Sequence, residues 1–348
     1  MYPRRHLLHE VRRVDAGRTV ESAELTQRTK TLLSEHEADL VVTAKEAVAE
    51  DVVAVELADP SGATLPAWTP GAHIDLVLSD QLTRQYSLCG NPADRGRWRV
   101  GVLKDPGSRG GSAFVHEQLE VGATVRTRGP RNHFPLIASP RYQFVAGGIG
   151  ITPIIPMIAE AQAAGADWQL LYGGRRRGSM AFTDELARHG DRVRFHPQDE
   201  LGMLDLPGAL GRPQPGTLVY CCGPEGLLAA VEAQCRGWPS KSLHVERFSA
   251  KPQEADAGAD AAIELVLERS GMTIEVPADQ SILEACEDAG ISVLGSCYEG
   301  ICGTCETVII DGVADHRDSV LSDDEQAANE VMMICVSRCK GPRLVLDL

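Results

Sequence analysis

Long hydrophobic runs are absent from this sequence. No apolar stretch approaches the roughly 20 residues that a membrane-spanning helix requires. The first 18 residues are basic but contain neither the apolar core nor the cleavage site of a secretory signal. With 43% hydrophobic and 24% charged residues, the composition is that of an ordinary globular protein. These features predict a soluble, cytoplasmic protein, in which ten cysteines serve metal or redox chemistry rather than disulfides.

Positive charge is also scarce. The chain has 34 Lys and Arg against 49 Asp and Glu, a net charge of −15, which makes nucleic acid an unsuitable partner. The imbalance is concentrated in residues 263–348, where 17 acidic residues stand against 5 basic ones, a net of −12. This excess either serves solubility or marks a docking face for a basic protein, because opposite fields speed association.

The cysteines near the C-terminus follow the order C-x4-C-x2-C…C. This spacing is typical of plant-type [2Fe–2S] clusters, and it predicts four ligands: Cys297, Cys302, Cys305 and Cys335. Glycines in the same loop allow tight wrapping and let backbone N–H groups point at the sulfurs. The alternative is a structural zinc site, but such sites usually pair their ligands in two short units, and only one is present. Cys339 is expected to be a spare thiol.

The length of 348 residues suits two or three domains. Residues 37–138 contain short alternating segments separated by Gly, Pro and Asp, which predict a small antiparallel β-barrel. Residues 139–248 alternate strands with helices and predict a parallel α/β sheet. A linker is expected at 249–262, followed at 263–348 by an α+β, β-grasp-like unit with the cysteine loop. Residues 1–36 show weak helical periodicity and are left unassigned.

Two Gly-rich turns follow strands of the α/β region. GGIGITP, residues 147–153, precedes a helix, where a phosphate can meet N-terminal N–H groups. It departs from G-x-G-x-x-G because Pro153 occupies the third glycine position. The second turn is CCGPEG, residues 221–226. In a parallel sheet both turns open at one edge, where ligands bind, so together they predict a nucleotide site.

Four motifs in this order, RQYSLCG, GGIGITP, CCGPEG and CYEGICGTC…MMICVSR, resemble those of the phthalate dioxygenase reductase family. The resemblance covers roughly residues 37–348. It implies a flavin-binding barrel holding FMN, a pyridine-nucleotide domain and a plant-type ferredoxin domain, which together feed electrons to an oxygenase.

The resemblance also implies roles for individual residues. The flavin would be bound by Arg84, Gln85, Tyr86, Ser87, Leu103, Lys104, Gly110, Gly111, Ser112 and Phe248. Arg84 would meet the phosphate together with the N–H groups of the SRGGS stretch, and Phe248 would cover the flavin or the nicotinamide. The nucleotide would be bound by Gly148, Gly150, Thr152, Arg175, Cys222, Gly223 and Pro224.

The exact cofactors remain open at this point. The short distance from Arg84 to Ser112, with no obvious adenine-binding extension, favours FMN, although FAD-binding relatives share the Arg-x-Tyr-Ser signature. Arg175, Arg176 and Arg177 stand where a ribose 2′-phosphate could bind, which argues for NADPH. The family tendency is NADH, and NADH is slightly preferred.

The expected chemistry is a conversion from two-electron to one-electron transfer. A nicotinamide gives two electrons as hydride, a [2Fe–2S] cluster carries one, and a flavin connects them. We therefore expect no general acid or base, and we interpret His133, His244 and His316 as structural.

The leading interpretation is a monomeric reductase of a Rieske-type oxygenase or demethylase, which docks on the acidic ferredoxin domain. The alternatives are the reductase of a haem monooxygenase and a non-catalytic, zinc-stabilised interaction module.

Overall fold

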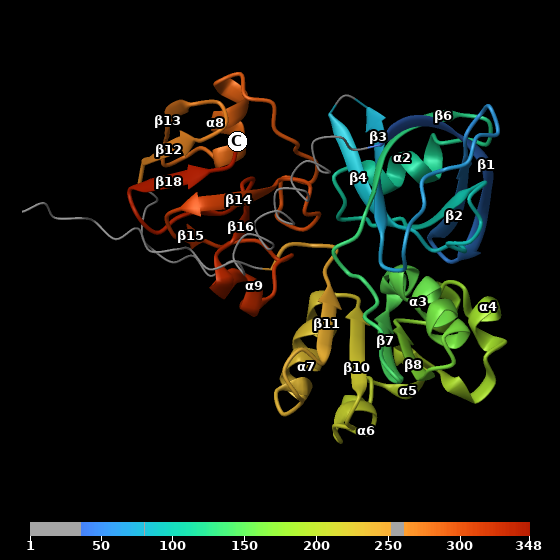
Figure 1. Ribbon diagram of the computed structural model, residues 1–348. Coiled ribbons are helices and arrows are strands. Elements are labelled where there is room, and N and C mark those ends of the chain that lie inside the picture. The colour runs from blue at the N-terminus through green and yellow to red at the C-terminus, as the bar shows by residue number, and fades with distance from the viewer. Residues whose placement is uncertain (1–35, 80, 252–260) are drawn as a thin grey trace, which may run out of the picture.

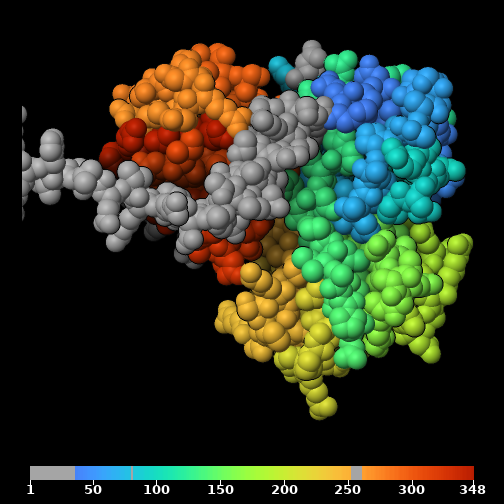
Figure 2. Space-filling model, in the orientation of Figure 1, coloured from blue at the N-terminus to red at the C-terminus, as the bar shows by residue number. Residues whose placement is uncertain are grey.

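The computed structural model describes residues 36–79, 81–251 and 261–348, which form units around three main β-sheets (Figure 1). Residues 1–35 of the unassigned segment and residues 252–260 of the expected linker lie outside this range. In the space-filling view the blue-to-green unit stacks directly on the green-to-yellow unit, and the orange-to-red unit lies to their side (Figure 2). None of the described helices has the length and apolarity needed to cross a bilayer.

The first unit is an antiparallel barrel. Its six strands, in the order β4-β3-β6-β1-β2-β5, are β1 (Glu37–Ala49), β2 (Val52–Ala58), β3 (His73–Ser79), β4 (Leu82–Ser87), β5 (Trp98–Leu103) and β6 (Thr124–Arg131). An isolated bridge between Leu88 and Val100 joins the two edges of the sheet. The core is filled by alternate residues of the strands, such as Leu40 and Val42 of β1 and Val55 and Leu57 of β2. Helix α2 (Gly111–Glu117) precedes β6.

The second unit is a five-stranded parallel sheet in the order β11-β10-β7-β8-β9. Its strands are β7 (Arg141–Gly147), β8 (Asp167–Gly174), β9 (Val193–Pro197), β10 (Thr217–Cys222) and β11 (Leu243–Glu246). The chain starts in the centre at β7, moves outward through β8 and β9, and returns to β10. The carboxyl ends of β7 and β10 therefore flank the point where the strand order reverses, which is where open α/β sheets bind ligands.

Helices connect the parallel strands. They are α3 (Ile151–Ala163), α4 (Thr183–Ala187), α5 (Gln198–Leu201), α6 (Leu206–Leu210) and α7 (Glu225–Cys235). Helix α3 buries Ile151, Ile154 and Ile158, spaced by three and four residues, against the sheet. Pro153 fits its first turn because an N–H there would have no partner within the helix.

The third unit has a mixed sheet in the order β13-β12-β18-β14-β16. Its strands are β12 (Ile263–Leu267), β13 (Met272–Val276), β14 (Glu306–Asp311), β16 (Val331–Met333) and β18 (Arg343–Leu346), with a small ladder of β15 (Ala314–Asp315) and β17 (Arg338–Cys339) beside it. Helix α8 (Ile282–Asp288) packs on the sheet through Ile282, Leu283 and Cys286, and helix α9 (Asp323–Ala328) precedes β16. The three predicted fold types, barrel, parallel α/β sheet and α+β unit, are thus confirmed.

Candidate functional site

The two Gly-rich turns lie against each other at the carboxyl edge of the parallel sheet. A Cβ atom on Gly150 would stand 2.3 Å from the carbonyl oxygen of Cys222 and 2.6 Å from the backbone nitrogen of Gly223. Gly148 adopts a φ of +54°, which a residue without a Cβ atom tolerates best, and its carbonyl accepts a 3.1 Å hydrogen bond from the Tyr172 hydroxyl. The turns are therefore packed backbone to backbone beside the start of α3.

The remaining residues predicted for the nucleotide complete this edge. Thr152 is buried, and its hydroxyl donates to the carbonyl of Ile149 at 2.9 Å, so it holds the first turn of α3. Cys222 ends β10 and is fully buried, while Gly223 and Pro224 lead into α7. Gly148, Gly150, Thr152, Cys222, Gly223 and Pro224 are thus brought together.

The predicted phosphate-binding residues of the barrel also meet. A Cβ atom on Gly111 would stand 2.4 Å from Cγ of Arg84, and the Arg84 guanidinium donates to the carbonyl of Arg109 at 3.1 Å. Burial, and then the charge of Arg109, lower the pKa of Arg84 below its usual value. Gly110 and Ser112 flank the same turn at the start of α2. The Arg84 guanidinium beside the backbone of the Gly110–Ser112 turn makes an environment that a phosphate would stabilise.

The other predicted residues of β4 contact two different parts of the molecule. Tyr86 is largely covered, and burial raises the pKa of its hydroxyl to about 12. Ser87 is buried and forms a side-chain hydrogen bond with Glu246. The Gln85 side chain faces the cysteine loop, where its amide donates to the hydroxyl of Ser296 at 2.6 Å and to Asp75 at 3.1 Å.

Three further residues predicted for the flavin lie at strand ends. Leu103 is the last residue of β5 and is 36% exposed. Lys104 follows it and pairs with Glu117 at 2.8 Å. Phe248, two residues after β11, is 40% exposed, which leaves its ring accessible to a planar ligand.

Sequence reasoning missed Glu246. This carboxyl group ends β11 and lies 3.9 Å from the Cys222 sulfur, between the predicted flavin and nucleotide residues. Burial raises its pKa to about 8, although hydrogen bonds from Cys222 and Ser87 act in the opposite direction. The group is therefore mostly neutral at pH 7. Its position in HVERF, two residues before Phe248, was the available signal.

The three arginines after β8 are not equivalent. Arg176 pairs with Glu50 of the barrel at 2.8 Å, and Arg177 lies 3.9 Å from Glu200. Arg175 is exposed and forms no ion pair within the described part of the chain. Among the described residues, Arg175 is thus the one of the three whose guanidinium group has no carboxylate partner.

The four predicted cluster cysteines converge. Their exposed fractions are between 3% and 8%. Cys297 is in hydrogen-bonding contact with both Cys302 and Cys335, and Cys335 with Cys305. Contact with Cys297, and then burial, raise the pKa of Cys302 well above its usual value, so its thiolate form needs a nearby positive charge.

Backbone donors surround these sulfurs as a [2Fe–2S] cluster requires. The N–H of Glu299 donates to the Cys297 sulfur at 3.3 Å, and the backbone of Gly300 bonds Cys335. Tyr298, Gly300 and Gly303 all have positive φ angles, which turn the loop inward. The donor set therefore fits the cluster. Cys339, in contrast, bonds the backbone of Arg343 and Gly341.

The three histidines interpreted as structural lie in different places. A Cβ atom on Gly303 would stand 2.2 Å from His133, so this ring covers the cluster loop. His244 stacks on Tyr220 at 4.6 Å between ring centres, and His316 lies 3.7 Å from Asp318.

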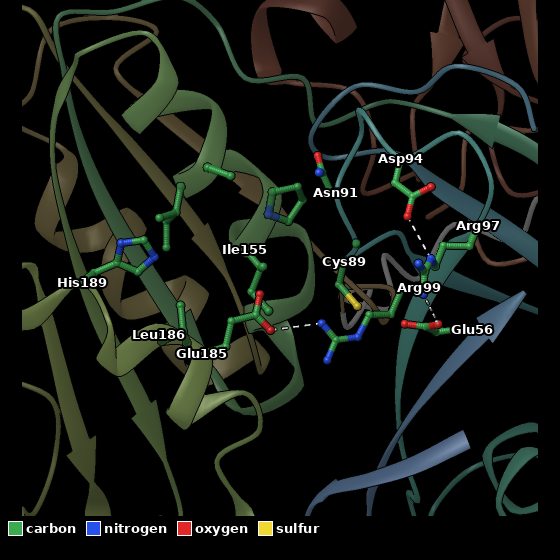
Figure 3. A pocket seen from close by; sticks show the side chains of 14 residues that line it. Glu56, Cys89, Asn91, Asp94, Arg97, Arg99, Ile155, Glu185, Leu186 and His189 are labelled. Carbon is green, nitrogen blue, oxygen red and sulfur yellow. Dashed lines mark hydrogen bonds and ion pairs between the residues drawn. The ribbon is translucent and has the colours of Figure 1, made fainter. Parts of the chain in front are cut away.

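A cavity of about 320 Å³ lies apart from all of these residues, between the barrel and helices α3 and α4 (Figure 3). Its charged side chains form ion pairs with one another: Arg99 pairs with Glu185 at 3.0 Å, and Arg97 pairs with Glu56 and Asp94. It contains none of the predicted site residues, so its size does not make it the functional site.

Comparison with known proteins agrees with this geometry. Residues 265–340 match the model of the 2Fe-2S iron-sulfur cluster binding domain. The phenoxybenzoate dioxygenase subunit beta of Ectopseudomonas oleovorans is 45% identical over 86% of this chain and 94% of its own length.

Two solved structures extend the comparison. An intact type IV self-sufficient cytochrome P450 monooxygenase is 48% identical over 90% of the chain, with a TM-score of 0.85, and the present chain spans 41% of its length. The phthalate dioxygenase reductase, described as a modular structure for electron transfer from pyridine nucleotides to [2Fe-2S], is 38% identical over 90% of this chain and 98% of its own, with a TM-score of 0.65. The chain therefore belongs to the phthalate dioxygenase reductase family of electron-transfer oxidoreductases, which use a pyridine nucleotide, a flavin and a [2Fe–2S] cluster.

Proposed function

We propose that this chain is the reductase component of a Rieske-type oxygenase or demethylase. It accepts hydride from a reduced pyridine nucleotide and delivers single electrons to the terminal oxygenase. The strongest support is that the nucleotide turns and the cysteine loop contact neighbouring residues of β4. Glu246 bonds both Cys222 of the second turn and Ser87 of β4. Ser296 of the cysteine loop bonds Gln85, the residue two positions before Ser87. Strand β4 thus contacts both the site where the nucleotide would deliver hydride and the loop that would hold the cluster.

Each group of residues has a separate task in this function. The backbone of the two turns holds the nucleotide, and Cys222, Ser87 and the neutral Glu246 shape the place where the nicotinamide arrives. Arg84 and the turn before α2 hold the flavin phosphate. The bound flavin supplies the exchange between two-electron and one-electron chemistry. The cysteine loop excludes water from the cluster through its buried sulfurs.

The proposed flavin is FMN. Arg84 and the turn at Gly110–Ser112 form one compact anion site, which suits a terminal phosphate. Heat release of the flavin followed by mass spectrometry tests this: a mass of FMN is expected, and FAD would refute it.

The proposed hydride donor is NADH. Carboxylates already pair two of the three arginines that could bind a 2′-phosphate, since Glu50 pairs with Arg176 and Glu200 lies near Arg177. We expect kcat/KM to be higher for NADH than for NADPH. Arg175→Ala should lower kcat/KM for NADPH and leave that for NADH almost unchanged, whereas equal losses with both nucleotides would refute a role in selecting between them.

The proposed partner docks on the acidic third unit of a monomeric reductase. The first turn of α9 alone exposes Asp323, Asp324 and Glu325. Reoxidation of the NADH-reduced chain by a Rieske-type oxygenase should slow as salt concentration rises, because exposed charges are screened. A rate independent of salt would refute electrostatic docking.

A haem monooxygenase is the second candidate partner. The higher TM-score with the self-sufficient P450 chain than with phthalate dioxygenase reductase, 0.85 against 0.65, favours it specifically. Mixing the reduced chain with a Rieske-type oxygenase and, separately, with a P450 haem domain distinguishes the two, because the true class of acceptor reoxidises the chain faster.

A further inference from the structure

The barrel contains a fully buried carboxylate at the face that meets the cysteine loop. Asp75 lies in β3 between Ile74 and Leu76, with none of its side chain exposed. It forms an ion pair with Arg131 of β6, whose side chain is 6% exposed, and it accepts a hydrogen bond from Gln85 of β4 at 3.1 Å. A charge in such a position is tolerated only when it is fully paired.

The remaining carboxylate oxygen is bonded by a residue of the third unit. The hydroxyl of Ser296 donates to Oδ2 of Asp75 at 2.6 Å and accepts from the Gln85 amide at 2.6 Å. The first distance is that of a charge-assisted O–H···O⁻ bond, which is stronger than a bond between neutral groups. Ser296 directly precedes the cluster ligand Cys297, so this bond fixes the start of the cysteine loop on the barrel.

Other contacts also join the barrel to the cysteine loop. The ring of His73 hydrogen-bonds the backbone of Cys302. The His133 ring occupies the space that a side chain on Gly303 would need. At the rim, Arg109 pairs with Glu299 at 2.8 Å, but both side chains are more than one-third exposed. An exposed pair of this kind contributes little, so the buried bond to Asp75 is the stronger anchor.

We infer that the Asp75–Arg131 pair is a docking socket for Ser296, and that Asp75 and Ser296 are positioning residues for electron transfer from the barrel to the cluster. Electron transfer rates fall steeply with distance, so a fixed contact between β4 and the cysteine loop keeps this step fast. The inference rests on the proposed function, because it requires a flavin beside β4.

Two substitutions at Ser296 test the socket without disturbing the barrel. Ser296→Ala removes the hydroxyl, and Ser296→Asp places a second carboxylate against Asp75. Ser270→Ala is the matched control, because Ser270 is exposed and its hydroxyl donates to the carbonyl of Leu267 in the turn after β12, within the third unit itself. In each full-length protein, stopped-flow absorbance after mixing with NADH separates flavin reduction from cluster reduction. Small-angle scattering reports docking independently of turnover, and the electron paramagnetic resonance spectrum reports the cluster.

The expected result is a split between the two steps. Flavin reduction by NADH stays at the wild-type rate in all variants. Cluster reduction slows by about tenfold in Ser296→Ala, the effect of losing one charge-assisted hydrogen bond, and further in Ser296→Asp. Ser296→Asp also shows a larger radius of gyration, and Ser270→Ala behaves as wild type.

Two results would overturn the inference. One is wild-type cluster reduction with unchanged scattering in both Ser296 variants, which would leave the proposed function intact. The other is an absence of flavin reduction by NADH in the wild-type protein, which would refute the proposed function and the socket together. If Ser296→Asp fails to assemble its cluster, Ser296→Ala and the scattering of both variants still decide.

Discussion

Gly150 is the position where a single methyl group should affect nucleotide binding most. The site of its Cβ atom lies 2.3 Å from the carbonyl oxygen and 2.4 Å from the carbonyl carbon of Cys222. Both are backbone atoms of the second turn, so no side chain can rotate to make room. The φ of Gly150 is an ordinary −62°, so the conflict is one of space and not of backbone conformation.

The expected cost of Gly150→Ala follows from overpacking. Forcing one methyl group into a tightly packed site costs about 1–3 kcal/mol. If the turns separate to relieve the conflict, the cost appears as weaker nucleotide binding, and 1.4 kcal/mol corresponds to about tenfold. We therefore expect the Kd for NADH to rise by roughly 5- to 150-fold. If the turns stay together, the cost appears as a lower Tm instead.

The assay is a titration of NADH binding together with thermal unfolding, with flavin content measured as a check on the barrel. Gly237→Ala is the control, because no described residue lies within 4 Å of its Cβ site. Gly147→Ala should give a smaller effect than Gly150→Ala, since it meets side-chain atoms of Leu227 and Pro224 at 2.7 and 2.8 Å. A Gly150→Ala protein with the Kd and Tm of the wild type would refute the packing argument.

Three further predictions concern the cluster and the nucleotide edge. Cys339→Ser should keep the iron content and cluster spectrum of the wild type, whereas Cys335→Ser should lose them; the opposite pattern in iron and sulfide analysis would contradict the ligand assignment. Glu246 is neutral below a pKa of about 8, so flavin reduction by NADH should slow above that pH as a negative charge forms beside Ser87, and Glu246→Gln should remove this dependence. The raised pKa of Glu246 also links protein stability to pH. The stability contributed by the protonated carboxyl is fully present below its unfolded pKa of about 4.5 and is lost as pH rises through its folded pKa of about 8. In urea unfolding between these pH values, the free energy of unfolding should therefore fall less in Glu246→Gln than in the wild type.

Much of the architecture could be predicted from local patterns. The alternation of apolar and polar residues in HIDLVLS and WRVGVLK predicted β3 and β5. The change to strand–turn–helix segments predicted the parallel sheet. The cysteine spacing predicted which four sulfurs converge, because ligand spacing reflects the geometry of the cluster itself. These features depend on residues that are close in sequence or on a fixed covalent pattern.

The contacts between units could not be predicted in the same way. Asp75 and Ser296 are 221 positions apart, and nothing in either local sequence indicates the other. The alternation in β3 places Asp75 on the face opposite Ile74 and Leu76, so the sequence did not indicate that its carboxylate is buried. Glu246 likewise depends on the parallel packing of β11 beside β10, since only that register places it near Cys222.

The arginines show a further limit of local patterns. Three consecutive arginines suggest a phosphate site when they are read along the sequence. Glu50, which pairs with Arg176, comes from the barrel, more than 100 positions earlier in the chain. The charge available to a nucleotide is therefore set by tertiary contacts.

An anaerobic titration of the purified protein with NADH, followed by visible absorbance and electron paramagnetic resonance, tests electron transfer from the nucleotide to the cluster. If electrons pass from NADH through the flavin to the cluster, the flavin and cluster bands both bleach and the signal of a reduced [2Fe–2S] cluster appears. A protein that contains flavin and cluster but whose cluster stays oxidised after NADH addition would contradict this electron path.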